Sequence, residues 1–185
     1  MNLTNLPNFL TISRIFLIPF MVAFFYWDTP ENRWILLGIF ITAGVTDFFD
    51  GYLARRNNNI SLLGRFLDPI ADKLLVAALI LMLVGFDRMA TISYLPAAII
   101  LLRELFVSGL REFLATAAIN VPVSGMAKWK TAIQMIALGF LIIGDGAPEI
   151  IHAQTIGEVG LWVAAVLTLI TGYKYWQFAL DHIID

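Results

Sequence analysis

The sequence contains no cysteine, and only 14% of its 185 residues are charged. Without cysteine the chain has neither a disulfide bond nor a thiolate metal site. A typical soluble domain carries about 25% charged residues, so this composition is unusual for a soluble protein. Neither of the two histidines, His152 and His182, has a cluster of candidate metal ligands around it, and we interpret both as surface residues. No internal repeat, low-complexity segment or linker is evident.

Hydrophobic residues make up 59% of the chain, and the mean hydropathy is +0.81. About 20 apolar residues are enough to cross a bilayer as a helix. Six apolar segments approach this length, so we expect an all-α integral membrane protein with six transmembrane helices and a single domain over residues 1–185. The segments are Pro7–Tyr26, Trp34–Leu53, Phe66–Phe86, Ile92–Ala115, Met126–Ile143 and Ile156–Leu180.

The loops between these segments alternate in charge. The loop "ARRNNNISLLGR" and the segment "SGMAKWK" are basic, whereas "WDTPENR" and "GDGAPEIIHAQT" are acidic. Basic loops face the cytoplasm in most membrane proteins, so both termini are predicted to be cytoplasmic. The first segment lacks the basic start and cleavage site of a signal peptide, and we expect it to be retained as a helix.

Four carboxylates gather where the second segment ends and the third begins. Asp47 and Asp50 are three residues apart, and Asp68 and Asp72 are four apart, so each pair shares one face of a helix. A short connection makes the two helices antiparallel neighbours. Both pairs are therefore expected at the cytoplasmic end, where four carboxylates repel one another unless cations offset their charge.

Two kinds of cation are available for this role. Ion pairs with nearby arginines and lysines explain any single aspartate well. Two divalent metal ions explain all four better, because carboxylate oxygens without histidine or cysteine suit Mg²⁺ or Mn²⁺. Two such ions form the usual clamp for phosphoryl or phosphodiester displacement. Gly51 lets a ligand approach the backbone, Arg55 can hold a phosphate, and the membrane location favours a lipid substrate.

The same residues reproduce a family signature without gap or substitution: Asp47-x2-Asp50-Gly51-x2-Ala54-Arg55-x8-Gly64-x3-Asp68-x3-Asp72. This motif resembles that of the CDP-alcohol phosphatidyltransferases. The resemblance covers nearly the whole chain, including "NLPNFLTISRIFLIPF", "LLRELFVSGLREFLA" and "KWKTAIQMIAL". It is strongest toward the bacterial members that use glycerol 3-phosphate as the acceptor.

The resemblance implies transfer of a phosphatidyl group from CDP-diacylglycerol to sn-glycerol 3-phosphate, with release of CMP. It also implies a homodimer of six-helix subunits, each with a polar cavity open to the cytoplasm. Asp47 and Asp68 would touch both metal ions, Asp50 and Asp72 one each, and Asp72 would be the general base. The positions matched to the CDP group are Gly51, Arg55 and Ser61, together with Asn8 and Thr11.

Ionisable residues within the fourth apolar segment need a separate explanation, because unpaired charges are costly inside a membrane. Arg103 and Glu104 can form a structural ion pair. Alternatively, Arg103, Arg111 and Lys128 bind the phosphate of the acceptor, with Glu104 orienting an arginine and Lys130 as a further candidate. We expect the second arrangement.

Other functions fit the sequence less well. An ion transporter is disfavoured because all four aspartates lie at one helix boundary and no inverted repeat is evident. A scaffold does not need so dense a cluster of charge. The remaining alternative is a sister enzyme with another acceptor, such as inositol phosphate. We expect a bacterial inner-membrane location, membrane lipids as the surroundings, and no nucleic-acid partner.

Overall fold

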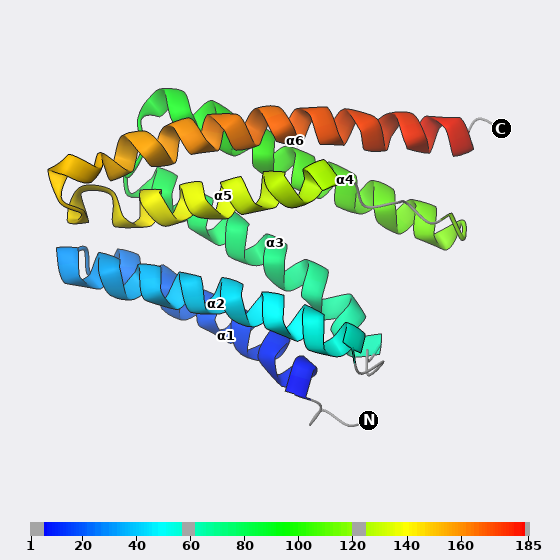
Figure 1. Cartoon of the computed structure of the whole chain (residues 1–185), viewed down its shortest axis with the longest axis horizontal. Coiled ribbons are helices and arrows are strands. Elements are labelled where there is room, and N and C mark those ends of the chain that lie inside the picture. Colours follow the sequence, from blue (N-terminus) through cyan, green and yellow to red (C-terminus); the bar gives the residue numbers. More distant parts are fainter. Residues whose placement is uncertain (1–5, 57–61, 120–124, 184–185) are drawn as a thin grey trace. The chain divides into compact units, whose positions relative to one another are not determined.

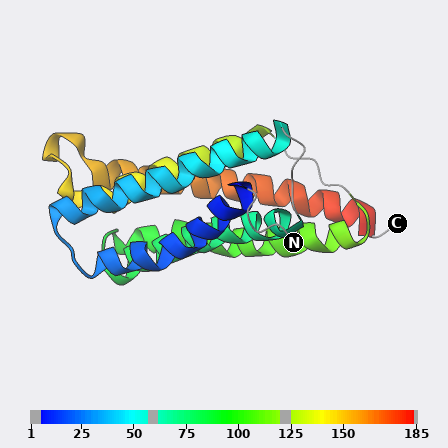
Figure 2. The same ribbon diagram turned by 90° about the horizontal axis from the view of Figure 1, so that it is seen from below.

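The computed structural model describes the backbone of residues 6–56, 62–119 and 125–183. Within these ranges it describes all side chains except those of residues 6–10, 47–56, 62, 63 and 65. All regular structure in the described ranges is helical (Figures 1 and 2). The elements are α1 (Leu6–Phe25), α2 (Pro30–Arg56), α3 (Leu62–Gly85), η1 (Thr91–Ser93), α4 (Tyr94–Thr116), α5 (Gly125–Ile143), η2 (Gly144–Gly146), η3 (Glu149–Ile151) and α6 (Ala153–Ile183).

Each of the six apolar segments is confirmed as an α-helix, but α2 and α3 each begin four residues earlier than predicted. α2 begins at Pro30 because the hydroxyl of Thr29 accepts a hydrogen bond from the backbone N–H of Asn32 at 3.3 Å. Proline at the first helical position and Glu31 in the first turn both favour this start. Polar residues can therefore extend a helix beyond its apolar core.

The start of α3 differs from prediction in a second way. The predicted segment Phe66–Phe86 leaves Gly64 before the helix and places Pro69 in its first turn, but α3 begins at Leu62 and includes both residues. Proline has no N–H to donate to the carbonyl of residue 65. The helix therefore continues through Pro69 with one intrahelical hydrogen bond fewer, directly beside Asp68.

Three helical stretches in the described part of the chain are long and apolar enough to cross a membrane: Thr91–Thr116, Gly125–Gly146 and Glu149–Ile183. A shorter apolar stretch covers Thr11–Phe25. These lengths and compositions are typical of a membrane protein. The crossing of a membrane by all six helices stays a prediction.

Contacts divide the chain into two compact units. The first contains residues 1–88 and 142–151, and the second contains residues 89–141 and 152–185. The assignment of residues 1–185 to one domain stays a prediction. In the first unit, α1 packs against both α2 and α3. Its core is formed by large apolar side chains that are almost fully buried, among them Met21, Phe25, Leu36, Phe40 and Leu79.

In the second unit, α4 packs along α6, and α5 approaches α6 closely at two glycines. A methyl group added at Gly157 would lie 2.7 Å from the Leu141 side chain and 3.0 Å from its backbone nitrogen. At Gly160 it would lie 3.0 Å from the Cβ of Ala137. Small residues at such contacts let helix backbones approach one another in membrane proteins.

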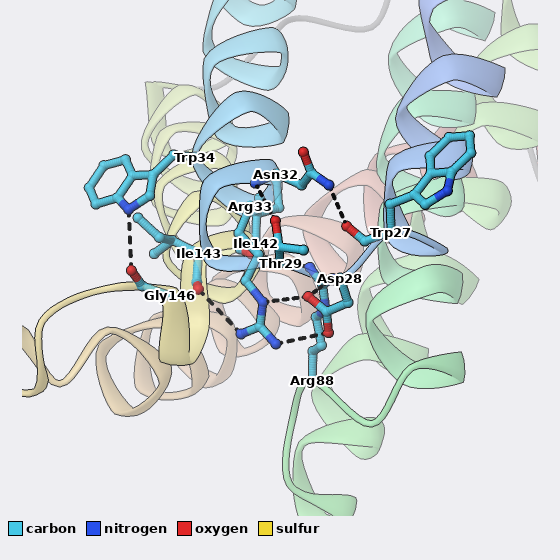
Figure 3. A network of polar contacts seen from close by, with 10 residues as sticks. All are labelled: Trp27, Asp28, Thr29, Asn32, Arg33, Trp34, Arg88, Ile142, Ile143 and Gly146. Atoms are coloured by element: carbon cyan, nitrogen blue, oxygen red, sulfur yellow. Dashed lines mark hydrogen bonds and ion pairs between the residues drawn. The ribbon is translucent and has the colours of Figure 1, made fainter.

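A polar network joins the loop after α1 to the ends of α3 and α5 within the first unit (Figure 3). Arg33 donates to both carboxylate oxygens of Asp28, from Nε at 2.6 Å and from Nη2 at 2.9 Å. Arg88 donates from Nη2 to Oδ1 of Asp28 at 2.7 Å. The same two arginines reach the carbonyls at the end of α5, Arg88 to Ile142 at 3.3 Å and Arg33 to Ile143 at 3.5 Å. One carboxylate thus holds two arginines that also cap α5.

The charges in this network predict a stability effect. The hydrogen bond from Arg33 to Asp28, together with the charge of Arg88, holds the pKa of Asp28 below its usual value despite partial burial. We expect Asp28→Asn to lower the free energy of unfolding by about 2 kcal/mol, because Arg88 is left buried without its counter-charge. Thermal unfolding in detergent measures this, with the exposed Asp181→Asn as a control.

The lowered pKa of Asp28 determines how its contribution to stability changes with pH. A carboxyl group with a lowered pKa in the folded state stabilises the fold above its unfolded pKa of about 3.9. The contribution of Asp28 is therefore fully present at neutral pH and decreases as the pH falls below about 4. An equal loss of stability in Asp28→Asn at pH 7 and at pH 3 would contradict this account.

Candidate active site

Two residues of α1 meet two of the predicted aspartates on α3. Thr11 donates a hydrogen bond from its hydroxyl to Oδ1 of Asp68. Arg14 donates from Nη1 to Oδ1 of Asp72 at 3.0 Å. Thr11 and Arg14 are three residues apart on one helix, and Asp68 and Asp72 are four apart on the other, so each pair occupies one face. The two contacts run in the same order along both helices, which fixes the register of α1 against α3.

The two partners of the Arg14–Asp72 ion pair differ strongly in burial. The Arg14 side chain is 2% exposed, whereas that of Asp72 is 54% exposed. The arginine therefore lies within the helix packing, and the carboxylate lies at its edge, accessible from outside. Asp68 is half-buried. This arrangement gives one anchored but accessible carboxylate, which suits a group that must bind a ligand or accept a proton.

The other predicted residues of this site lie outside the described side chains. The backbone of α2 carries Asp47, Asp50, Gly51 and Arg55 in its last turns, and that of α1 carries Asn8 in its first turn. Ser61 lies outside the described residues altogether. Their roles at the metal ions and at the CDP group therefore stay predictions.

The donors that are described suit a hard divalent cation. Asp68 and Asp72 supply carboxylate oxygens one helical turn apart, and Mg²⁺ and Mn²⁺ prefer such oxygen ligands. The described side chains include no group of three or more acidic, histidine or cysteine residues that could hold a metal, since those of Asp47 and Asp50 are not among them. The residues present thus fit the predicted metal in their chemistry.

A second polar cluster lies in the second unit, between α4, α5 and α6. Glu104 accepts hydrogen bonds on Oε1 from Arg103, at 3.3 Å, and from Lys130. Arg103 also donates from Nη2 to the hydroxyl of Thr171 at 2.8 Å, and its guanidinium carbon lies 5.7 Å from the centre of the Tyr175 ring. Both cations are largely buried, with side chains 10% and 6% exposed. Two cations share one carboxylate, so the cluster carries a net positive charge.

Buried polar atoms accompany this cluster. Arg103 Nε, Gln134 Oε1 and Thr168 Oγ1 form no hydrogen bond with the described residues. Gln134 lies one turn after Lys130 on α5, and Thr168 lies one turn before Thr171 on α6, so each shares a helix face with a member of the cluster. Such buried polar atoms favour a polar ligand, and among them Arg103 Nε is a charged donor that suits an anion.

The predicted phosphate-binding residues differ in their surroundings. Arg103 belongs to the buried cluster, whereas Arg111 and Lys128 are exposed. Lys130, which we ranked below Lys128, is the buried lysine. Glu104 contacts Arg103 as expected and contacts Lys130 as well.

Sequence reasoning missed Arg14. The signal was present, because an arginine in the middle of an apolar helix is uncommon and calls for a partner. Its position three residues after Thr11 placed it on the face that was already a candidate for ligand binding.

Comparison with known proteins identifies the family of the chain. Residues 4–170 match the model of the CDP-alcohol phosphatidyltransferase family. The chain is 49% identical over 173 residues to a CDP-diacylglycerol--glycerol-3-phosphate 3-phosphatidyltransferase of Rickettsia bellii, covering 94% of each chain. Proteins of the same name from Haemophilus influenzae and Cereibacter sphaeroides are 39% and 37% identical over at least 96% of each chain. The chain belongs to the CDP-alcohol phosphatidyltransferase family.

Proposed function

We propose that this protein transfers the phosphatidyl group of CDP-diacylglycerol to sn-glycerol 3-phosphate. The products are phosphatidylglycerophosphate and CMP, and the reaction serves phospholipid biosynthesis. The observation that carries the proposal is the 49% identity, over 94% of both chains, to a relative named for this reaction. The accessible Asp72 beside Asp68, on the helix where the family signature ends, supports it.

The aspartates are the proposed metal ligands: Asp47, Asp50, Asp68 and Asp72. Two Mg²⁺ or Mn²⁺ ions bound there would polarise the pyrophosphate and stabilise the charge that develops on the CMP leaving group. Thr11 supports this role because its hydroxyl holds one oxygen of Asp68. Gly51, Arg55 and Ser61, with Asn8 and Thr11, are proposed to hold the CDP group.

Asp72 is the proposed general base. It accepts the proton of the acceptor hydroxyl, and that oxygen forms a new bond to the β-phosphorus, which carries the diacylglycerol. The bond from this phosphorus to the bridging oxygen of the pyrophosphate breaks, and CMP leaves with that oxygen. A single displacement balances the reaction without a covalent enzyme intermediate.

The cluster in the second unit is the proposed site for the phosphate of the acceptor. Arg103 and Lys130 are buried cations whose charges Glu104 offsets only in part. A phosphate dianion that enters such surroundings gains strongly from charge-assisted hydrogen bonds. Arg111 and Lys128 are proposed to contribute from exposed positions.

The remaining proposals concern the membrane. Six transmembrane helices follow from the apolar segments, and cytoplasmic termini follow from the charge pattern of the loops. A polar cavity open to the cytoplasm and an inner-membrane location follow from the family resemblance. A homodimer follows from the family resemblance. The acyl chains remain in the bilayer while the reacting phosphate lies at headgroup level.

The acceptor is tested by CMP release in membranes that contain the protein, CDP-diacylglycerol and Mg²⁺. We expect glycerol 3-phosphate to support release and inositol phosphate to leave it at background. Faster release with inositol phosphate would instead identify the sister enzyme.

The phosphate site predicts a selective effect on substrate binding. Arg103→Ala and Lys130→Ala are expected to raise the apparent KM for glycerol 3-phosphate by about 10-fold or more, because each removes a cation that contacts the phosphate. The KM for CDP-diacylglycerol should change far less. Steady-state kinetics with each substrate varied in turn measures both values.

Lys174→Ala is a suitable control for this comparison, because Lys174 is an exposed cation of the same unit. Normal affinity for glycerol 3-phosphate combined with poor expression would show that Arg103, Glu104 and Lys130 form a structural ion-pair network instead.

A further inference from the structure

The burial of Arg14 requires an explanation beyond packing. It is one of the largest fully buried side chains in the described part of the chain, and no other residue of its helix is charged. Placing a guanidinium inside such a helix costs several kcal/mol unless it is paired. A buried ion pair is, in addition, a poor source of net stability compared with an apolar pair of similar volume. A functional role accounts better for an arginine at this position.

The geometry of the contact indicates what that role is. Arg14 reaches Oδ1 of Asp72 with Nη1, at 3.0 Å, from a side chain that is 2% exposed. Asp72 remains 54% exposed. The arginine thus fixes the carboxylate from the interior while the carboxylate stays accessible from outside. An exposed aspartate without such a partner samples several rotamers.

We propose that Arg14 is a positioning residue that orients Asp72 for its work at the metal ions and at the acceptor hydroxyl. This inference rests on the proposed role of Asp72 and adds a residue that lies outside the family signature. Hydrogen-bond partners of metal-ligating groups fix the orientation of the ligand, and their loss typically lowers metal affinity or activity by about 10–100-fold.

The contact between Thr11 and Asp68 strengthens this inference. One turn before Arg14 on α1, Thr11 holds Oδ1 of Asp68 in the same way. Two consecutive positions on one face of α1 therefore each hold one oxygen of a candidate metal ligand. α1 acts as a template that sets the orientation of both carboxylates on α3.

A matched control is available in the same unit. Arg88 is also buried, with a side chain 4% exposed, and it pairs with Asp28 at 2.7 Å. Asp28 lies in the loop after α1, and Arg88 lies after α3. Arg88→Gln therefore removes a buried, ion-paired arginine of the first unit without touching Thr11, Asp68 or Asp72.

The experiment compares Arg14→Gln, Arg14→Lys, Asp72→Ala, the double variant Arg14→Gln/Asp72→Ala, and Arg88→Gln in the purified protein. Mn²⁺ binding is measured by electron paramagnetic resonance without substrate, together with kcat, both KM values and the melting temperature. We expect Arg14→Gln to lower kcat by about 10–100-fold and to weaken Mn²⁺ binding by about 10-fold. The KM for CDP-diacylglycerol should stay within about twofold of the parent value.

Arg14→Lys should lower kcat and Mn²⁺ affinity less than Arg14→Gln does, since lysine keeps the positive charge but not the planar guanidinium. In the Asp72→Ala background, the further change Arg14→Gln should not weaken Mn²⁺ binding any more, because Arg14 acts through the carboxylate of Asp72. Arg88→Gln should lower the melting temperature and leave kcat per folded molecule and Mn²⁺ affinity unchanged. If Arg14→Gln does not fold, the same measurements on Arg14→Lys decide the question.

Three results would overturn the inference. Arg14→Gln could behave like Arg88→Gln, with normal kcat and Mn²⁺ affinity. The double variant could lose as much Mn²⁺ affinity as the two single variants together, or Mn²⁺ could bind more tightly to Arg14→Gln than to the parent protein. Tighter binding would show that Arg14 competes with the metal rather than orienting its ligand. Failure of the proposed function gives a different result, because Asp72→Ala itself then keeps normal kcat and normal Mn²⁺ affinity.

Discussion

Asp68→Ala is expected to abolish CMP release while the protein remains folded in the membrane. Asp68 is the proposed ligand of both metal ions, so its loss removes an oxygen that no neighbouring side chain in the described part of α3 can replace. Thr11 also loses the acceptor of its hydrogen bond. The combined loss should lower kcat by at least about 10³-fold, since charge stabilisation at the leaving group depends on both metal ions.

The matched control for Asp68→Ala is Asp181→Ala, an exposed acid on α6. Its CMP release should equal that of the parent protein. Excess chelator should reproduce the effect of Asp68→Ala in the parent protein, and added Mg²⁺ or Mn²⁺ should reverse it. Full activity in chelator would show that the aspartates do not work through a divalent cation.

Asp72→Asn is expected to damage the chemical step more than the binding of the CDP-lipid. The amide has almost the size of the carboxylate and can still accept a hydrogen bond from Arg14 at Oδ1. It cannot accept the proton of the acceptor hydroxyl at a useful driving force. Loss of general base catalysis alone lowers the rate by about 10²–10⁴-fold.

Single-turnover kinetics with CDP-diacylglycerol already bound separates the two effects. We expect the rate per bound substrate to fall and the dissociation constant of CDP-diacylglycerol to change little. A normal single-turnover rate combined with a collapse of lipid affinity would show that Asp72 binds substrate rather than acting as the base.

Much of the fold follows from hydropathy alone, because a long apolar segment in a membrane protein satisfies its backbone only as a helix. All six apolar segments are helices within a few residues of the predicted bounds. The start of α2 was missed because polar groups decide it, and the start of α3 was missed because a helix can continue through a proline. Thr29 and Glu31 extend α2, and the backbone tolerates Pro69 inside α3.

The candidate site was predictable only in part, for a related reason. Residue type and spacing on one helix identify a shared face, and they correctly placed Asp68 and Asp72 one turn apart. They do not reveal which face of a second helix lies opposite. The contact of Arg14 with Asp72 joins residues 58 positions apart, so spacing along the chain could not reveal it.

The same limit applies to the lysines of α5. Lys128 and Lys130 are two residues apart and therefore point to different sides of the helix. Hydropathy treats the two lysines alike. Only the packing of α5 shows that Lys130 is the buried one and that it reaches Glu104.

Transfer of label from glycerol 3-phosphate into lipid tests the central claim most directly. The purified protein is placed in vesicles with CDP-diacylglycerol, Mg²⁺ and isotopically labelled sn-glycerol 3-phosphate, and mass spectrometry measures both products. We predict one labelled phosphatidylglycerophosphate for each CMP released, and neither product with Asp68→Ala. CMP release without labelled lipid, which indicates hydrolysis of the donor, or labelled lipid formed at the parent rate by Asp68→Ala, would contradict the account.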